Sequence, residues 1–241
     1  MIIGWAVWPG WFPPAAINFI SSRVCRNSGT LMMPLPLMIR LPDLVPDKLI
    51  RGLIRRYRTI DGFLSSAEGV LLFRLANRLP RDAVVVEIGS WKGKSTYCLA
   101  CGLRSGRVHA IDPFDASGEP GSRETYEQTR TERPLREQFE ANLAAFSGKI
   151  RVHQGFSQAF SGAFAAIDLL LIDGDHSREG CAHDFTHYGP KLRSGGFVAF
   201  HDYYPHRPDF GPTWVIENLV KSDARFREHA RADSLWVARR I

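Results

Sequence analysis

Short apolar runs alternate with longer stretches of mixed polarity from residue 83 onward, and this alternation limits the fold more than any other feature of the chain. The runs have the length of buried strands: AVVVEI (83–88), RVHAI (107–111), KIRVH (149–153), IDLLLI (167–172), GFVAFH (196–201) and LWVAR (235–239). The stretches between them predict helices at 94–103, 132–146, 157–165, 177–192 and 212–221. This order predicts an α/β fold, in which helices cover both faces of a parallel sheet.

The first 80 residues are organised differently. The first 22 carry no charge and are interrupted by prolines, so we expect a poorly structured leader over 1–40 rather than a signal peptide or a membrane span. N-terminal helices are predicted within 41–80, at 47–60 and 66–79, ahead of the main domain at 81–241. The helix at 47–60 places arginines between apolar residues. Either it contacts a membrane surface or partner, or, as we favour, it packs on the domain.

The net charge of +6 comes from this N-terminal part of the chain. Residues 1–58 carry eight Lys and Arg but two Asp and Glu, whereas residues 59–241 carry 23 of each kind. A neutral main domain argues against a nucleic acid partner. Four cysteines are too few for a disulfide scaffold of this length, and the pair Cys98 and Cys101 falls inside a predicted helix. We therefore expect packed, reduced thiols and a cytoplasmic protein.

A glycine-bearing loop, EIGSWKGKS (87–95), follows the first predicted strand. Glycine allows the backbone to approach a ligand closely, and the helix that follows presents free N–H groups. The loop lacks the dinucleotide fingerprint G-x-G-x-x-G and is one residue shorter than the phosphate-binding loop G-x-x-x-x-G-K-[ST]. The carboxylate of Glu87 at its start would repel phosphates and suits a ligand with an ammonium group. About 20 residues further on, Asp112 ends a strand where it can accept from both hydroxyls of an adenosine ribose.

These motifs, VVEIGSWKGKST and VHAID, resemble those of the class I S-adenosylmethionine-dependent methyltransferases over about residues 62–241. The resemblance implies a doubly wound, mostly parallel Rossmann-like sheet of seven strands with an N-terminal helical extension, and S-adenosyl-L-methionine as cofactor. Glu87 would face its ammonium group, and Asp112 would hold its ribose diol. The other implied cofactor contacts are small residues of the loops after the first and third strands: Gly89, Ser90, Gly93, Ser95, Gly155 and Ser157.

Carboxylates and histidines follow the fourth and fifth predicted strands, where IDLLLIDGDH ends in Asp173 and His176 and GGFVAFHD ends in His201 and Asp202. The pattern resembles the metal-dependent O-methyltransferases, notably the bacterial macrolide-sugar group of macrocin and mycinamicin type. That resemblance implies Asp173, His201 and Asp202 as ligands of a divalent metal and His176 as general base. Oxygen ligands suit Mg²⁺. At His201 the sequence departs from this group, which has an acid there. The alternative is that these residues only cap loops and bind the cofactor.

We therefore predict metal-assisted O-methylation of a small hydroxylated acceptor, such as a sugar or a phenol. Two rivals stay open: a P-loop NTPase, whose magnesium-binding strand would be 167–173, and a non-catalytic cofactor-binding module. The pair His183 and His187 resembles the zinc motif HExxH, but Asp replaces Glu and a third ligand is missing. A membrane contact would involve residues 1–60, the excursion 115–131 could act as a lid, and the sequence is compatible with a homo-oligomer.

Overall fold

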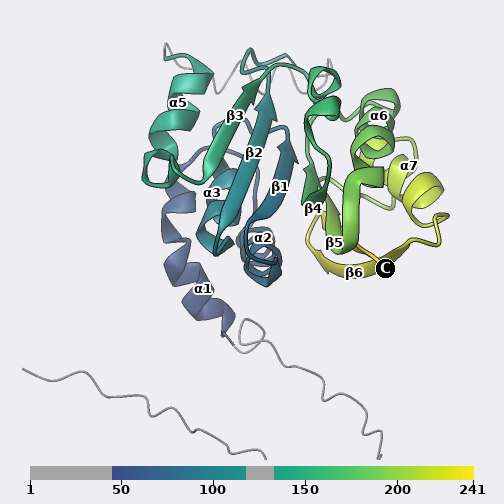
Figure 1. Ribbon diagram of the computed structural model, residues 1–241, viewed down its shortest axis with the longest axis horizontal. Coiled ribbons are helices and arrows are strands. Elements are labelled where there is room, and N and C mark those ends of the chain that lie inside the picture. Colours follow the sequence, from purple (N-terminus) through teal and green to yellow (C-terminus); the bar gives the residue numbers. More distant parts are fainter. Residues whose placement is uncertain (1–44, 118–132) are drawn as a thin grey trace, which may run out of the picture. The chain divides into compact units, whose positions relative to one another are not determined.

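The computed structural model describes residues 45–117 and 133–241, and Figure 1 shows their arrangement. The leader predicted over 1–40 and most of the excursion at 115–131 lie outside the described residues. Among the described helices, none combines the length and the apolar character that a bilayer crossing requires.

A seven-stranded sheet forms the centre of the domain, in the order β3-β2-β1-β4-β5-β7-β6. Its strands are β1 (Ala83–Ile88), β2 (Gly106–Asp112), β3 (Ile150–Gln154), β4 (Ile167–Ile172), β5 (Leu192–Phe200), β6 (Phe226–Ala232) and β7 (Leu235–Arg240). Strands β1 to β5 are parallel, and β7 runs antiparallel to both of its neighbours. The predicted fold class, a doubly wound and mostly parallel α/β sheet, is confirmed.

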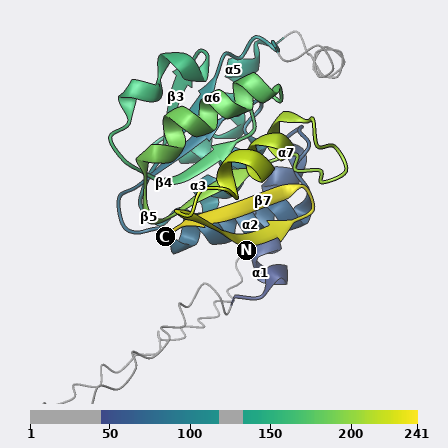
Figure 2. The same cartoon turned by 90° about the vertical axis from the view of Figure 1, so that its right-hand side faces the viewer.

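Helices cover both faces of this sheet, as Figure 2 shows for the face under α6 (Arg178–Tyr188) and α7 (Gly211–Val215). One core packs the strands against α1 (Asp47–Leu53), α2 (Ser66–Arg78), α3 (Lys94–Gly102) and α5 (Leu135–Asn142). The second core joins alternate residues of the same strands to α6 and α7. Side chains of consecutive strand residues point to opposite faces, so a strand buried on both sides is apolar throughout. In β4 all six residues, IDLLLI, are buried.

The chain reverses its strand order between β1 and β4, which are hydrogen-bonded neighbours. Ligands of doubly wound sheets bind outside the carboxyl ends of the strands at such a switch point. The loops after β1 and β4 touch here. A Cβ atom on Gly89, which has φ +85°, would lie 2.0 Å from the carbonyl oxygen of Asp173. Glycine at this position therefore lets the two loops close over the end of the sheet.

The N-terminal helices belong to the same core as the sheet. The predicted helix at 47–60 is α1 followed by a 3₁₀ turn over Arg55–Thr59, and Ile50, Ile54 and Tyr57 are buried against the domain. The interpretation as a helix packed on the domain is confirmed. Helix α2 begins at a capping box in which Ser65 and Glu68 each accept a hydrogen bond from the other's backbone N–H.

Several elements differ from the sequence prediction. Strand β5 begins at Leu192, within the helix predicted at 177–192 and ahead of the strand predicted at 196–201. The helix predicted at 157–165 is a pair of 3₁₀ turns, Ser157–Ala159 and Ser161–Ala163. The Tyr188 hydroxyl donates to the Ser157 carbonyl oxygen, the acceptor that the first turn of an α-helix would use. Strand β6 was not predicted, because its sequence FREHARA forms a largely exposed edge strand without an apolar run.

Candidate active site

An open cavity of about 1010 Å³ lies at the carboxyl ends of the parallel strands. The loops after β1 to β5 all contribute to its lining. Every site residue predicted from the sequence lines this cavity except Glu87 and Gly93. The topology therefore brings together at one place residues that are more than 100 positions apart in the chain.

Glu87 lies behind the cavity wall, fully buried at the end of β1. Its Oε2 atom accepts hydrogen bonds from Ser90 Oγ at 3.0 Å and Thr96 Oγ1 at 2.5 Å. Burial raises the pKa of Glu87 to about 7, against the lowering effect of its hydroxyl donors. Because Glu87 does not line the cavity, it can affect a ligand only through its neighbours Ser90 and Ser95, which do line it. Gly93, with φ +87°, forms the N-cap of α3 and packs on Leu143.

Asp112 ends β2 and holds the glycine loop in its conformation. Its Oδ2 atom accepts from the backbone N–H groups of Ser90 at 2.9 Å and Trp91 at 2.8 Å, and Oδ1 accepts from Phe114 N at 2.6 Å. Burial raises the pKa of Asp112, and the three N–H donors oppose that rise. A carboxylate offers about four acceptor positions, so Asp112 keeps one for a ligand hydroxyl.

The loop after β3 is fixed by α6. Ser157 Oγ donates to Asp184 Oδ1 at 2.5 Å, and burial raises the pKa of Asp184 to about 7. Gly155, with φ +144°, and the exposed ring of Phe156 line the same part of the cavity. An apolar ring beside glycine backbone is suited to the face of a planar heterocycle.

A cluster of carboxylates and imidazoles occupies the ends of β4 and β5. His201 Nδ1 lies 3.2 Å from Asp173 Oδ1 and 3.4 Å from Asp202 Oδ2, and these three residues could hold one metal ion. Asp202 adopts φ +60°, a strained backbone conformation for a non-glycine residue. His176 Nε2 lies 3.4 Å from Asp202 Oδ2 and 3.7 Å from Asp173 Oδ1. The predicted ligands and the predicted base thus converge on one point.

Glu68 of α2 contacts His201 of this cluster and was not predicted as a site residue. It is 2% exposed, and its Oε2 atom lies 3.3 Å from His201 Nε2. Burial by itself would lower the pKa of His201, but the carboxylates of Asp173, Asp202 and Glu68 outweigh burial and raise it. For Glu68 the effects are reversed: burial by itself would raise its pKa, but the contact with His201 lowers this pKa to about 2. The only sequence signal for Glu68 was its place in the first turn of a predicted helix.

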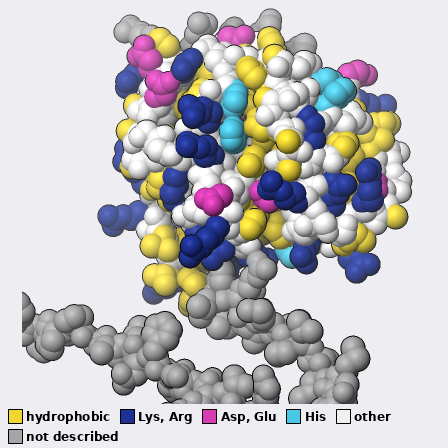
Figure 3. Space-filling view, in the orientation of Figure 1, with side chains coloured by type: hydrophobic (Ala, Val, Ile, Leu, Met, Phe, Trp, Pro, Cys, Tyr) yellow, Lys and Arg dark blue, Asp and Glu magenta, His cyan; other side chains and the backbone are white. Residues whose placement is uncertain are grey.

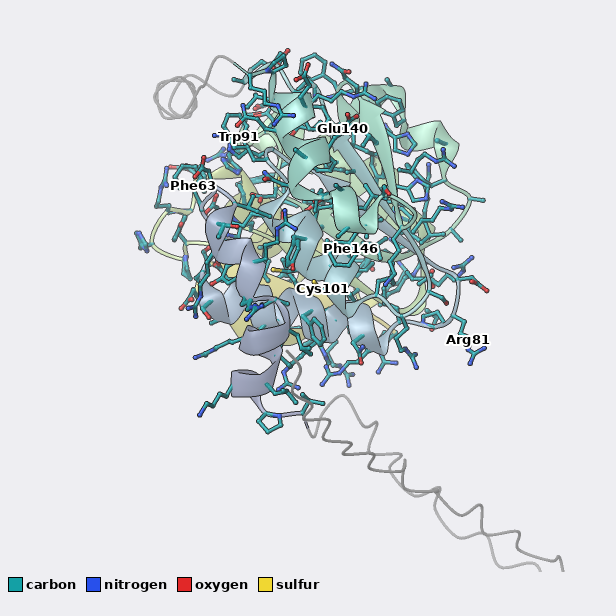
Figure 4. The ribbon with its side chains drawn as sticks, turned by 90° about the vertical axis from the view of Figure 1, so that its left-hand side faces the viewer. Phe63, Arg81, Trp91, Cys101, Glu140 and Phe146 are labelled. Carbon is teal, nitrogen blue, oxygen red and sulfur yellow. The ribbon has the colours of Figure 1, made fainter. Side chains whose placement is uncertain are left out.

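Aromatic side chains surround the cavity next to this cluster. Figure 4 shows Phe63, from the segment before α2, close to Trp91 of the glycine loop, and both line the cavity. Tyr204 and Phe210, after β5, line it as well, and Arg207 lies 4.0 Å from the ring centroid of Phe210. None of these aromatic residues was predicted as a site residue from the sequence. The segment before α2 contributes Gly62–Leu64 to the lining, and the described part of the 115–131 excursion contributes Ala116 and Ser117.

The competing motifs lead to no second site in the described part of the chain. Lys94, which a phosphate-binding loop would aim at its ligand, donates to the Gly62 carbonyl oxygen at 2.8 Å. The rings of His183 and His187 stack on each other on α6. Among the described residues, only Asp173, His201 and Asp202 form a group able to hold a metal. Cys98 is a buried free thiol whose pKa is raised by burial. On the face shown in Figure 3, Lys and Arg side chains are spread among other residue types.

Residues 86–203 match a family described as a methyltransferase domain. A curated protein of Acanthamoeba polyphaga mimivirus, named uncharacterized protein R132, is 24% identical over 138 residues, which cover 57% of this chain and 59% of that protein. An O-methyltransferase from Bacillus cereus, solved in complex with SAH, is similar in structure with a TM-score of 0.55 and 17% identity, covering 84% of this chain and 92% of that one. The O-methyltransferase TomG from Streptomyces achromogenes, solved with SAM, has a TM-score of 0.54 and 19% identity, with coverage of 85% and 92%. At these identities the solved structures show a shared fold.

Proposed function

Residues 86–203 belong to the methyltransferase-domain family, and on that basis we propose that the protein is an S-adenosylmethionine-dependent O-methyltransferase assisted by a divalent metal. One observation carries the proposal. A single cavity has a glycine loop and a strand-end carboxylate at one side and the cluster of Asp173, His176, His201 and Asp202 at the other. This arrangement suits a methyl donor and a metal-bound acceptor placed next to each other.

The residues of the cofactor side fit S-adenosylmethionine. Gly89 and Gly155 have positive φ values and leave the space that a Cβ atom would fill. Asp112 keeps an acceptor position for a ribose hydroxyl, and Glu87 Oε1 is buried without a hydrogen-bond partner among the described residues. The carboxyl group of Glu87 lies behind Ser90, and in its ionised form it complements an ammonium group. When bound, the cofactor would supply a methyl group on a sulfonium, with S-adenosylhomocysteine as the leaving group.

The cluster fits a divalent cation and a proton acceptor. Asp173, Asp202 and His201 offer ligand atoms within 4.8 Å of one another, and a cation there would lower the pKa of an acceptor hydroxyl. His176 faces the same point and can take the hydroxyl proton on its Nε2 atom, a step typically worth about 10²–10⁴-fold in rate. Phe210, whose ring centroid lies 5.4 Å from that of His176, limits access of water to the ring.

The acceptor is a small hydroxylated molecule that fills the aromatic part of the cavity. Phe63, Trp91, Tyr204 and Phe210 line the cavity, and aromatic rings can stack on a phenol or on the apolar face of a sugar ring. The neutral main domain gives no support for a nucleic acid acceptor. The match covers 59% of the curated relative, so the activity that we propose is that of this chain and not of the relative.

Two measurements test the proposal. Calorimetry should detect binding of S-adenosylhomocysteine, whereas ATP with Mg²⁺ should produce no heat beyond that of Mg²⁺ alone; the reverse result would favour the NTPase. A screen of tritiated-methyl transfer to sugar, phenol, lipid and RNA extracts should label sugars or phenols. EDTA should abolish the transfer and Mg²⁺ or Mn²⁺ should restore it. Full activity after exhaustive chelation would remove the metal from the proposal, and cofactor binding without transfer to any extract would favour a binding module.

A further inference from the structure

A buried carboxylate on α2 contacts the histidine of the metal-binding cluster from the side opposite the cavity. His201 is 5% exposed, and its two ring nitrogens have separate partners. Nδ1 faces Asp173 and Asp202, whereas Nε2 lies 3.3 Å from Glu68 Oε2. Metal-binding histidines commonly present one nitrogen to the ion and donate the other ring N–H to a carboxylate, which fixes the tautomer and the orientation of the ring.

Glu68 is itself held by three hydrogen bonds that come from two segments of the chain. Its Oε2 atom accepts from Ser65 N at 2.7 Å, and Oε1 accepts from Ser234 N at 3.0 Å and Ser234 Oγ at 2.7 Å. Ser65 caps α2, and Ser234 lies in the turn between β6 and β7. A carboxylate with this many donors cannot turn away from His201 without leaving part-buried N–H groups unpaired.

The identity of residue 201 depends on this neighbour. An acid at position 201 would place two buried carboxylates about as close as His201 and Glu68 are now, and like charges at that distance repel strongly. An imidazole at this position instead donates to the carboxylate from one nitrogen and leaves the other free to bind. Glu68 therefore favours histidine over an acid at position 201, and the cluster has one nitrogen ligand beside its carboxylate oxygens.

We propose that Glu68 is a positioning residue that holds His201 as a nitrogen ligand, so that the site prefers a first-row transition cation over Mg²⁺. This inference rests on the proposed metal assistance. Carboxylate oxygens suit Mg²⁺, whereas imidazole nitrogen suits ions such as Co²⁺ and Zn²⁺. The sequence expectation of Mg²⁺ rested on the oxygen-rich character of the cluster, although His201 was already named as one of its ligands. In the site as built, two carboxylates and one imidazole face one another.

Calorimetry of the full chain with Co²⁺ and with Mg²⁺ tests the inference. The wild type should bind Co²⁺ more tightly, and Glu68→Gln should weaken Co²⁺ by about 10–100-fold, the usual effect of losing such a partner. Affinity for S-adenosylhomocysteine should stay unchanged. In the double variant Glu68→Gln/His201→Glu, the ratio of Co²⁺ to Mg²⁺ affinity should fall below that of the wild type. The visible absorption of bound Co²⁺ should change in the same variant as nitrogen ligation is lost.

The control is Glu140→Gln, which removes an exposed carboxylate on α5 that pairs with Arg136. This variant should bind both cations as the wild type does. If Glu68→Gln fails to fold, Ser234→Ala removes one donor to Glu68, together with a contact of Ser234 Oγ at 3.4 Å to His201 Nε2, and should weaken Co²⁺ several-fold.

Three results would overturn the inference. Equal Co²⁺ affinity in the wild type and Glu68→Gln would refute the role of Glu68 while leaving metal assistance intact. An unchanged Co²⁺ to Mg²⁺ ratio in the double variant would refute nitrogen ligation. A wild type that binds S-adenosylhomocysteine but neither cation would remove metal assistance from the proposed function, and this inference with it.

Discussion

Replacing Asp112 by asparagine tests how one buried carboxylate shapes the cofactor side of the cavity. In the structure its two oxygens accept from three backbone N–H groups, those of Ser90, Trp91 and Phe114. An amide has one acceptor oxygen, and its NH₂ group cannot accept. Whichever way the asparagine turns, it leaves at least one of these N–H groups without a partner.

The size of the effect follows from that count. A buried donor left unsatisfied costs about 1–3 kcal/mol, so Asp112→Asn should lower the free energy of unfolding by at least that amount. With a typical denaturant dependence, the urea midpoint should fall by roughly 0.5–1.5 M. The glycine loop loses its anchor and a ribose acceptor is weakened. The affinity for S-adenosylhomocysteine should therefore fall at least about fivefold, which corresponds to about 1 kcal/mol.

The assay pairs urea unfolding with calorimetry and uses Asp115→Asn as control. Asp115 is an exposed carboxylate in the loop that follows Asp112 and β2, and its Oδ1 atom accepts a hydrogen bond from Ser117 N. Its replacement should leave both measurements close to those of the wild type. If Asp112→Asn kept the wild-type midpoint and the wild-type affinity, the anchoring role of this carboxylate would be refuted. A lower midpoint with unchanged affinity would limit its role to the fold.

Three further predictions address the base, a buried acid and the leader. His176→Ala should cut turnover by about two to four orders of magnitude while leaving cofactor and cation affinity nearly intact in calorimetry; unchanged turnover would exclude it as base. The pKa of Glu87 is about 7 in the folded protein against an ordinary value of 4.5, so the folded state binds more protons between these values and stability should fall by about 3 kcal/mol as pH rises from 4.5 through 7. Glu87→Gln should lose that fall in pH-dependent urea unfolding, and an equal fall in the variant would assign it to other groups. A chain that starts at Met38 should melt cooperatively with unchanged affinity for S-adenosylhomocysteine, and a loss of several degrees in Tm would show that residues 1–40 support the fold.

Local patterns in the sequence were enough to predict the architecture and the position of the site. Buried strands are apolar along most of their length, so β1 and β4 could be predicted from AVVVEI and IDLLLI, which carry one acidic residue each. Because the carboxyl ends of parallel strands meet at one edge, residues that follow different strands could be expected at one cavity. The convergence of Asp173 and Asp202 follows from this rule. Edge strand β6 escaped prediction, because a strand with largely exposed residues needs no apolar pattern.

Periodicity and glycine spacing are properties of neighbouring positions, and they therefore indicate which residues stand at the ends of strands. What those residues touch depends on the packing of the whole domain. Asp112 was expected from the sequence to bind a ligand. In the fold it also accepts hydrogen bonds from the backbone of the glycine loop. Glu68 was an ordinary first-turn residue of a helix until packing placed it 3.3 Å from His201, 133 positions later. Contacts of this kind depend on how helices pack on the two faces of the sheet, and no local pattern of residues carries that information.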